Sequence, residues 1–430
     1  MDYRIFPPDG MIETTVNLPL SKSICNRLLI INALNPEAEP MPVRAICDDS
    51  DVLAEILAME IPYDQHFKVD VHAAGTAFRF LTAFFASHEG AIVEITGTER
   101  LRQRPIAPLV DALRKLGAEI EYLEKDGFAP LLIRGHRLSG GEIDINATVS
   151  SQFISALLMI APTMNKPLTI RLDGEPISRP YILMTLGLME QAGAKTFFER
   201  DVITVENEPY TNEVFDIEPD WSAASYWYEI AAISAGFVTL PGLPLKSLQG
   251  DSATARYFRG LGVRTEESEE VAGALDLCAD PDVNARLETD LSETPDIAQT
   301  LAVTCGTLGI NFHLKGLGSL KVKETDRLEA LRKEMDKIGI IVEIRNDSEL
   351  VWNGERHPIF EMPAFDTYQD HRMAMALAPV SIFIPGLIIR DIEVVSKSYP
   401  GFWDDLKNAG FTITDASVPL PEPDEAGSKI

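Results

Sequence analysis

Two cations and two hydroxyls stand at the start of the first predicted helix, in the stretch LPLSKSICNR. The proline ends any strand, and the helix is expected to begin near Ser21 or Ser23 and to continue through the apolar residues that follow. Cations in a first turn oppose the helix dipole by about 0.3–1 kcal/mol each, so Lys22 and Arg27 are unusual for a purely structural helix start. Since free N–H groups at a helix start favour an anion, this stretch indicates an anion site.

A similar helix start recurs in LKVKETDRLEALRK, where Asp326 is the expected N-cap. Lys323 and Arg327 lie four residues apart around Glu324 at the junction of loop and helix. The later charges of this helix are typical of a solvated surface. For Lys323, Glu324 and Arg327 two interpretations remain open. They belong to an ordinary surface helix, or they form a site in which cations accompany an acid that transfers a proton.

Two further segments place arginines before helices. In TYQDHRMAMALAPV, Arg372 precedes an apolar helix, its methionines are expected in the core, and His371 is expected to be a structural hydrogen bonder. In TERLRQRPIAP, Arg100, Arg102 and Arg104 alternate before a proline. Such arginines can bind carboxylate or phosphate through two parallel hydrogen bonds, although a solvated basic loop explains them equally well.

Uncharged donors complete the pattern. Ser150, Ser151 and Gln152 open a predicted helix, and N-capping explains one of the two serines but not both. Asp296 lies in the first turn of another helix, where an acid is ordinary. The collected cations, hydroxyls and two candidate acids predict a site for one or two highly anionic small molecules, with proton transfer as its chemistry.

The composition narrows the class of ligand. The chain has 430 residues, is 45% hydrophobic and carries a formal charge of -28, so it should repel nucleic acid and anionic membranes. No apolar run reaches the ~20 residues of a membrane span, and the N-terminal residues lack a signal-peptide layout. The four cysteines form no CxxC pair, which favours a reducing cytoplasm and no zinc or disulfide framework. Rossmann and P-loop nucleotide motifs are also absent from the sequence.

A repeat must position these residues. Five segments combine an amphipathic stretch, a glycine and a strand-like run, at intervals of about 70 residues. Glycine ends a helix at low cost because it accepts positive φ. The five glycines are Gly117, Gly193, Gly262, Gly339 and Gly410. A weaker sixth copy without glycine covers residues 52–61, so the sequence predicts an α/β or α+β protein of two similar lobes with three units each.

Ten motifs in order resemble those of the 5-enolpyruvylshikimate-3-phosphate (EPSP) synthase family of enolpyruvyl transferases, over roughly residues 12–413. They include SKSICNR, AGTAFRFLTA, RLRQRPI, SSQFISALL, PDIAQTLA, VKETDRL and DHRMAMA. The resemblance implies an inside-out α/β barrel type of fold, with three βαβαββ units in each lobe. One lobe would combine residues 1–20 with 219–416, the other would cover 21–218, and residues 417–430 are expected to be a disordered tail.

The resemblance also assigns roles. Catalysis would involve Lys22, Asp296 and Glu324, with Glu324 exchanging a proton with the enol methylene. Shikimate 3-phosphate would be bound by Lys22, Ser23, Arg27, Ser150, Ser151, Gln152, Ser178, Tyr181, Asp296 and Lys323. Phosphoenolpyruvate would be bound by Lys22, Gly75, Arg104, Gln152, Arg327, Arg372 and Lys397. No metal and no organic cofactor is expected, and a monomer with small-molecule partners alone is implied.

Three residues depart from the family pattern. Leu20 replaces the usual glycine before SKS, Ala73 replaces the asparagine before AGT, and Phe80 replaces the proline after the arginine of that motif. The alternatives to EPSP synthesis are enolpyruvyl transfer to UDP-N-acetylglucosamine and a catalytically silent anion-binding relative. The first uses a loop cysteine that the RQRP loop lacks, and the second draws support from these three departures alone.

Overall fold

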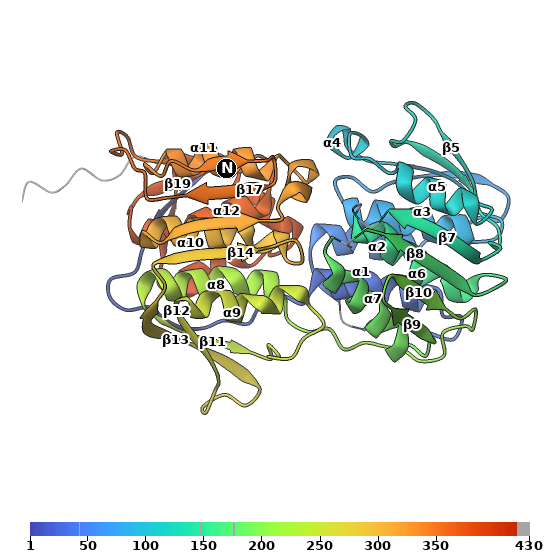
Figure 1. The fold of residues 1–430 in the computed structure, drawn as a ribbon, viewed down its shortest axis with the longest axis horizontal. Helices are drawn as coiled ribbons and strands as arrows, with labels where there is room; N and C mark the ends of the chain where they lie inside the picture. Colours follow the sequence, from blue (N-terminus) through green and yellow to red (C-terminus); the bar gives the residue numbers. More distant parts are fainter. Residues whose placement is uncertain (43, 147, 149, 175–176, 419–430) are drawn as a thin grey trace, which may run out of the picture.

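Two lobes lie side by side in the computed structural model, which describes residues 1–42, 44–146, 148, 150–174 and 177–418 (Figure 1). One lobe, drawn in blue to green, contains the apolar core built from residues 24–217. The residues from 219 onward form the other, together with the N-terminal strands. The α/β fold expected from the sequence is confirmed.

The first lobe contains two complete βαβαββ units and a pair of helices. The first unit comprises β3 (His66–Asp70), α3 (Gly75–Ser87), β4 (Ile92–Thr96), the short α4 (Glu99–Arg102), α5 (Ala107–Lys115), β5 (Glu119–Tyr122) and β6 (Leu131–Arg134). The second comprises β7 (Gly141–Asn146), α6 (Ser151–Ile160), β8 (Leu168–Asp173), α7 (Arg179–Gln191), β9 (Thr196–Glu199) and β10 (Val202–Val205). The remaining pair is α1 (Lys22–Ala33) and α2 (Asp48–Leu57), without a sheet of its own in the described residues.

The second lobe contains three units. One comprises β2 (Glu13–Thr15), α8 (Trp221–Ser234), β11 (Phe237–Pro241), α9 (Thr254–Arg259), β12 (Leu261–Glu267) and β13 (Ala274–Val283). Another comprises β14 (Arg286–Asp290), α10 (Ala298–Leu308), β15 (Asn311–Lys315), α11 (Arg327–Asp336), β16 (Glu343–Arg345) and β17 (Glu349–Trp352). The last comprises β18 (Ala364–Phe365), α12 (His371–Leu377), β19 (Leu387–Ile389), α13 (Phe402–Asn408), β20 (Thr412–Asp415) and the N-terminal β1 (Tyr3–Phe6).

Each of these five units closes a four-stranded sheet with one strand order, for example β3-β4-β6-β5 and β7-β8-β10-β9. The first two strands of a unit pair in parallel through a helical crossover, and the hairpin adds antiparallel partners. In β7, Ile143 and Ile145 are buried while their neighbours are exposed, so one face of the strand covers the core.

Four of the five predicted glycine stops follow their helices with positive φ, from 77° at Gly339 to 101° at Gly117. The exception corrects the prediction for Gly262. There α9 ends at Gly260, which has negative φ, and Gly262 lies inside β12 where the register with β13 shifts. Its positive φ of 87° serves a β-bulge rather than a helix end.

Three nearly fully buried helices form the centre of each lobe. In the first lobe α1, α3 and α6 contact one another, and in the second α8, α10 and α12 do so. The two apolar cores are separate, one drawn from residues 24–217 and the other from residues 5–18 and 221–411. Helices that are apolar all round require this central position.

The chain passes between the lobes twice, and the two passages pair with each other. Leu20 forms an antiparallel bridge with Pro219, flanked by hydrogen bonds from Ser21 N to Glu218 O and from Asp220 N to Pro19 O, both of 2.8 Å. Leu20 also packs against the first core. This residue therefore lies in the double crossover rather than in the anion site itself.

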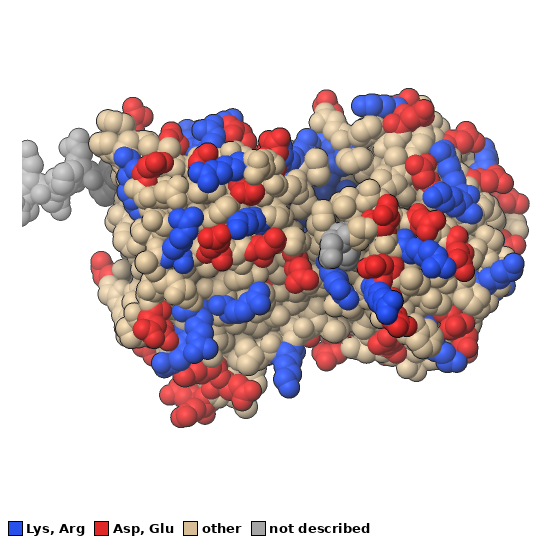
Figure 2. All heavy atoms as spheres, in the orientation of Figure 1, with Lys and Arg blue, Asp and Glu red and all other residues tan. Residues whose placement is uncertain are grey.

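Negative charge gathers away from the boundary between the lobes. Figure 2 shows acidic side chains concentrated at the hairpin between β12 and β13, where Glu266, Glu267, Glu269 and Glu270 are exposed. No helix of the described chain is long and apolar enough to cross a bilayer. Of the expected tail, residues 417 and 418 form a turn on Asp415, and residues 419–430 lie outside the described residues.

Candidate active site

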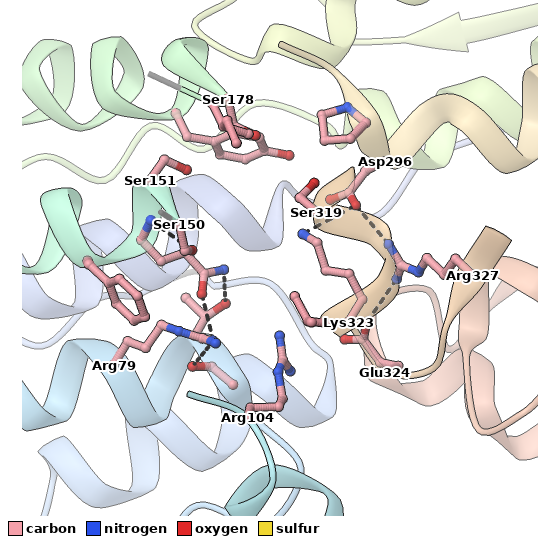
Figure 3. Close-up of a pocket in the computed structure, with 18 of the residues that line it drawn as sticks. Arg79, Arg104, Ser150, Ser151, Ser178, Asp296, Ser319, Lys323, Glu324 and Arg327 are labelled. Atoms are coloured by element: carbon pink, nitrogen blue, oxygen red, sulfur yellow. Dashed lines mark hydrogen bonds and ion pairs between the residues drawn. The ribbon is translucent and has the colours of Figure 1, made fainter. Parts of the chain in front are cut away.

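A cavity of about 620 Å³ lies between the two lobes and receives side chains from both. In Figure 3, Arg79, Arg104 and three serines approach it from the first lobe, and Asp296, Ser319, Lys323, Glu324 and Arg327 approach from the second. Of the predicted site residues, fourteen line it: Lys22, Ser23, Gly75, Arg104, Ser150, Ser151, Gln152, Ser178, Tyr181, Asp296, Lys323, Glu324, Arg327 and Arg372. Residues more than 300 positions apart in the chain thus meet in one space.

Helix N-termini converge on this cavity. The first residues of α1, α3, α6 and α12 all line it, namely Lys22, Gly75, Ser151 and His371. The short helix η3 (Pro295–Ile297), which leads into α10, adds Asp296. Each N-terminus contributes N–H groups that have no carbonyl partner within the helix and the positive end of a dipole, so the arrangement favours anions from several directions.

Side-chain N-caps fix the starts of α1, α6, α11 and α12. Ser21 accepts a hydrogen bond from Ile24 N, Asp326 from Glu329 N, and Asp370 from Arg372 N. Ser150 caps α6 by accepting from Gln152 N at 3.3 Å, which leaves Ser151 as the serine that capping does not explain. The capping signals in the sequence therefore predicted where these side chains enter the cavity.

Arg327 is the centre of the acidic wall. Its guanidinium donates to Asp296 Oδ1 at 2.8 Å, to Glu324 Oε2 at 2.9 Å and to Asp370 Oδ2 at 2.6 Å. Only 2% of the arginine side chain is exposed, so these ion pairs lie in a low-dielectric interior. One buried cation thus orients both candidate catalytic acids.

Asp296 is held as a carboxylate. Burial opposes its ionisation, but Arg372, Lys323 and Arg327 together keep the pKa of Asp296 well below its usual range. Lys323 Nζ lies 3.6 Å from Asp296 Oδ1, and Arg372 Nη2 lies 3.4 Å from Oδ2. Burial lowers the pKa of Lys323, although Asp296 partly restores it. An ionised acid beside a lysine of lowered pKa can accept or relay a proton.

Glu324 has the same electrostatic character. Burial favours its neutral form, yet Lys397, Arg327 and Arg104 hold the pKa of Glu324 well below its usual range. Its two oxygens contact Arg327 and Lys397, the latter with Nζ at 3.1 Å. The unliganded site therefore presents Glu324 as a proton acceptor, and an anionic ligand that offsets these cations would allow it to donate.

Lys22 remains charged at the other wall. Burial lowers its pKa, but the neighbouring Asp49 outweighs this effect, and the net shift is upward. The ammonium lies 3.2 Å from Asp49 Oδ2, and Lys22 N approaches Asp220 Oδ2 at 3.4 Å. The lysine thus offers a fixed positive charge to the cavity, close to the crossover between the lobes.

Two predicted ligand residues do not line the cavity in the described structure. Arg27 is 2% exposed, donates to Thr185 Oγ1 at 2.7 Å and to Ser23 O at 2.8 Å, and lies over the ring of Phe80. Arg27 therefore lies behind the residues that line the cavity, because its guanidinium donates to groups inside the protein. Lys397 contacts the wall through Glu324 and through Ala73 O at 3.4 Å.

Several residues that line the cavity were not predicted from the sequence. Arg79 is 6% exposed and donates to Gly75 O and to Gln152 Oε1, both at 2.9 Å. Ser319 and Asp49 also line the cavity. A lone arginine inside the apolar run GTAFRFLTAFF was a signal for a buried, functional cation, since an unpaired arginine is costly in a core.

His371 corrects one expectation. It lines the cavity, yet neither ring nitrogen has a hydrogen-bond partner among the described residues, so it is not the structural hydrogen bonder expected. Burial and the nearby Lys22 hold the pKa of His371 well below its usual range, which makes the imidazole neutral. A neutral ring can donate or accept one hydrogen bond from a ligand.

Arg102 lies away from the cavity, and its contacts differ from those of Arg100 and Arg104 in the same motif. It donates to Gly97 O at 3.2 Å and to Glu124 Oε1 at 3.2 Å, both in its own lobe. Arg104 lines the cavity, and Arg100 reaches across to the other lobe. The alternating arginines therefore have three different functions in the structure.

No group of three or more His, Cys, Asp and Glu side chains suited to a metal is present in the part of the chain that the structure describes. The four cysteines are free, and none lines the cavity among those residues. The polar groups that line the cavity include cations, hydroxyls, the carboxylates of Asp49, Asp296 and Glu324, and the imidazole of His371.

Comparisons with known proteins agree with this chemistry. A family model described as EPSP synthase (3-phosphoshikimate 1-carboxyvinyltransferase) matches residues 48–406. A 3-phosphoshikimate 1-carboxyvinyltransferase of Bacteroides fragilis is 49% identical over 415 residues, covering 96% of this chain and 99% of that protein. One from Vibrio cholerae is 33% identical over 434 residues, covering 94% and 98%. The EPSP synthase structure from Acinetobacter baumannii has the same fold, with a TM-score of 0.73 at 18% identity over 96% of this chain and 100% of that chain.

Proposed function

This chain belongs to the EPSP synthase family, the 3-phosphoshikimate 1-carboxyvinyltransferases, and we propose that its cavity joins phosphoenolpyruvate to the 5-hydroxyl of shikimate 3-phosphate. It is a transferase of the shikimate pathway, which leads to the aromatic amino acids. One observation carries the assignment of the site: cations and helix N-termini from both lobes surround a single cavity that holds two ionised acids. Two polyanions that must react with each other require such a site.

Shikimate 3-phosphate binds along the wall of the first lobe. Its phosphate is received by the hydroxyls of Ser150, Ser151 and Ser178, at the starts of α6 and α7. Ser178 has a left-handed φ of 58°, a strained conformation of the kind that often accompanies a binding function. Ser23, Gln152 and Tyr181 complete this wall, Lys22 reaches it from α1, and Asp296 with Lys323 faces the ring hydroxyls.

Phosphoenolpyruvate binds between the two cationic walls. Its carboxylate and phosphate are surrounded by Lys22, Gly75, Arg104, Gln152, Arg327, Arg372 and Lys397. Arg27 acts through Ser23 and Tyr181, because its own guanidinium donates to the main-chain oxygens of these two residues. Lys397 acts from the edge of the cavity through its contact with Glu324.

The reaction proceeds by addition and elimination. The 5-hydroxyl oxygen bonds to C2 of phosphoenolpyruvate while its proton passes to the Asp296 carboxylate, and Glu324 delivers a proton to the C3 methylene. The ammonium of Lys22 stabilises the negative charge that develops on the attacking oxygen. The product of this step is a tetrahedral intermediate. The C2–O bond to phosphate then breaks, C3 returns a proton to Glu324, and the double bond is restored. Cations on both walls stabilise the departing phosphate.

The lobes 21–218 and 1–20 with 219–416 supply complementary halves of this site, and their two separate cores support the division. We place the enzyme in the cytoplasm as a monomer. Free thiols on all four cysteines suit a reducing compartment, and one chain provides every wall of the cavity.

Phosphate release from mixed shikimate 3-phosphate and phosphoenolpyruvate tests the proposal directly. Turnover that requires both substrates is the expected result. Phosphate release with UDP-N-acetylglucosamine in place of shikimate 3-phosphate would instead identify the related transferase. Tight binding of both substrates without release would identify a silent relative.

A further inference from the structure

Arg100 connects the first lobe to the main chain of the candidate acid in the second. It lies on α4, which Figure 1 shows at the edge of the first lobe that faces the other lobe. Its Nη2 donates to Lys323 O at 2.9 Å and its Nε to Glu324 O at 3.1 Å. A guanidinium has a fixed planar fork, so two donors on adjacent carbonyls restrict both the distance and the orientation of the segment they hold.

The segment that receives these bonds is irregular, and its side chains, but not its carbonyls at Lys323 and Glu324, have partners in the second lobe. It joins the short helix η4 (Gly318–Val322) to α11 and contains neither helix nor strand. Among the described residues, no other hydrogen bond is made to the carbonyls of Lys323 and Glu324. The position of this main chain therefore depends on a donor from the opposite lobe.

The carboxylate of Glu324, unlike its main chain, is held by side chains of its own lobe. It contacts Arg327 and Lys397, both of the second lobe. Ligand contacts from the first lobe come from residues such as Arg104, which follows Arg100 on the same chain segment and lines the cavity. The contact of Arg100 thus sets the distance between the acid and a ligand bound on the wall of the first lobe.

Lys397 makes one other polar contact between the lobes near this acid, because its Nζ lies 3.1 Å from Glu324 Oε1 and donates to Ala73 O at 3.4 Å. That contact reaches the carboxylate of Glu324 and not its main chain. Two further contacts between the lobes lie away from the acid. Ser396 Oγ donates to Asp48 Oδ2 at 2.6 Å, and Ser178 N donates to Ser292 O at 3.0 Å. These hold the lobes near each other without contacting the main chain of Glu324. Arg100 does not line the cavity among the described residues, so its effect on the reaction must pass through the segment it holds.

We infer that Arg100 is a positioning residue for proton transfer, which places the Glu324 carboxylate at the reacting carbon when the lobes lie together. This inference rests on the proposed function. Arg100 is itself exposed, and exposed hydrogen bonds add little to folding stability. Its removal should therefore slow turnover while the free energy of unfolding changes little.

The test compares Arg100→Ala and Arg100→Lys with Arg102→Ala, a matched control on the same short helix whose partners lie in its own lobe. Arg100→Ala should lower kcat about 10²-fold, because small displacements of a reacting group cost that much, with the KM of shikimate 3-phosphate within about threefold. Arg100→Lys should recover part of kcat through one remaining donor. Deuterium entry from D₂O into C3 of the enolpyruvyl group, followed by NMR, should slow in parallel with kcat.

The outcomes separate the two hypotheses. No phosphate release by the unaltered protein would overturn the proposed function and this inference with it. Normal release by the unaltered protein and a kcat within twofold for Arg100→Ala would overturn only the positioning role. Equal losses in Arg100→Ala and Arg102→Ala would also overturn it, because they would indicate disruption of α4 alone.

Discussion

Arg327 Nε donates to Asp370 Oδ2 at 2.6 Å, and the two side chains are 2% and 0% exposed. This pair joins the start of α11 to the start of α12 beneath the cavity. Asp370 also caps α12 through Arg372 N at 3.0 Å. Asp370→Ala should therefore leave a buried cation undercompensated and lower the free energy of unfolding by about 3–5 kcal/mol. Urea denaturation measures this loss.

Asp404→Ala is the control for that substitution. Asp404 pairs with Lys407 at 3.1 Å on an exposed face of α13, where its side chain is 78% exposed. Surface pairs of this kind contribute little, so the urea midpoint should hardly move. Similar small losses in both variants would show that the Arg327–Asp370 pair does not hold the two helix starts together.

Glu324→Gln removes the proposed proton-transfer group and keeps its shape. We expect kcat to fall by roughly 10²–10⁴-fold, as for loss of a general acid or base, with shikimate 3-phosphate binding nearly unchanged. Steady-state kinetics and calorimetric titration measure the two quantities. Glu343→Gln, an exposed glutamate on β16, should retain normal turnover. Near-normal kcat in Glu324→Gln would remove this residue from the proton transfers.

Lys22→Met should abolish most turnover, because it removes a fixed positive charge from the wall that faces both ligands. The substitution also leaves Asp49, 4% exposed, without its 3.2 Å partner, so thermal unfolding must be followed alongside activity. Lys68→Met, which disrupts an exposed pair with Glu94, provides the comparison. A folded Lys22→Met protein with unaltered turnover would show that the first helix start is structural.

Gly75→Ala should weaken phosphoenolpyruvate binding. A Cβ at this position would lie 2.5 Å from Arg104 Nη1 and 3.0 Å from Arg79 Nη1, so the guanidinium groups must move. Since these are the ends of flexible side chains, the protein should still fold. We expect the KM for phosphoenolpyruvate to rise about tenfold, equivalent to about 1.4 kcal/mol, and that for shikimate 3-phosphate to stay within a few-fold.

Gly401→Ala is the matched control for the glycine substitution. Gly401 has a negative φ of -79°, and a Cβ there would meet Asp405 at an ordinary 3.7 Å, away from the cavity. Both KM values should be unchanged. A phosphoenolpyruvate KM that does not rise in Gly75→Ala would mean that Arg104 adapts without loss of contact.

Local signals in the sequence predicted the helix starts. Asp326 was expected as an N-cap, and it accepts a hydrogen bond from Glu329 N. The first helix was expected to begin near Ser21 or Ser23, and Ser21 is its N-cap. Capping depends on four consecutive residues, so the information is contained in the stretch itself. The repeat of helix, glycine and strand likewise identified the α/β units, because each element stops for a local reason.

The features that the sequence did not predict depend on contacts between residues far apart in the chain. Arg27 is a residue type that often binds anions, so it was predicted to contact the ligand. Its guanidinium instead donates to Thr185 and Ser155, which are distant in the sequence. Among the residues that the structure describes, neither ring nitrogen of His371 has a hydrogen-bond partner, because the elements packed around it supply none. Gly262 serves a bulge whose register depends on β13. None of these partners can be identified from neighbouring residues alone.

The sequence also did not predict the strained backbone next to the site. Tyr368 and Gln369 have φ of 54° and 58° directly before Asp370. Tyr368 is held there by its hydroxyl, which donates to Glu334 Oε1 at 2.6 Å, and Glu334 also accepts from Asp366 N at 3.0 Å. Non-glycine residues adopt this region when surrounding contacts require it, and those contacts come from a distant helix.

Glu229 places a carboxyl in the apolar centre of the second lobe. It lies on α8, is 0% exposed, and neither oxygen has a hydrogen-bond partner among the described residues. Burial raises the pKa of Glu229 well above its usual range, so the folded protein carries it neutral. A group with a raised folded pKa stabilises the fold below its unfolded pKa, and this stability is lost as pH rises toward the folded value.

Glu229→Gln keeps the shape and removes the titration. Above an unfolded pKa of about 4.5, the original protein should lose about 1.4 kcal/mol of unfolding free energy per pH unit relative to the variant, for as long as Glu229 stays protonated in the fold. In urea denaturation from pH 5.5 upward, the free energy of unfolding of the variant should therefore rise relative to that of the original protein, until Glu229 ionises in the fold. Glu60→Gln, at an exposed glutamate, should show a constant difference over the same range. A constant difference for Glu229→Gln as well would mean that Glu229 ionises normally in the fold, through hydration or a partner that satisfies its charge.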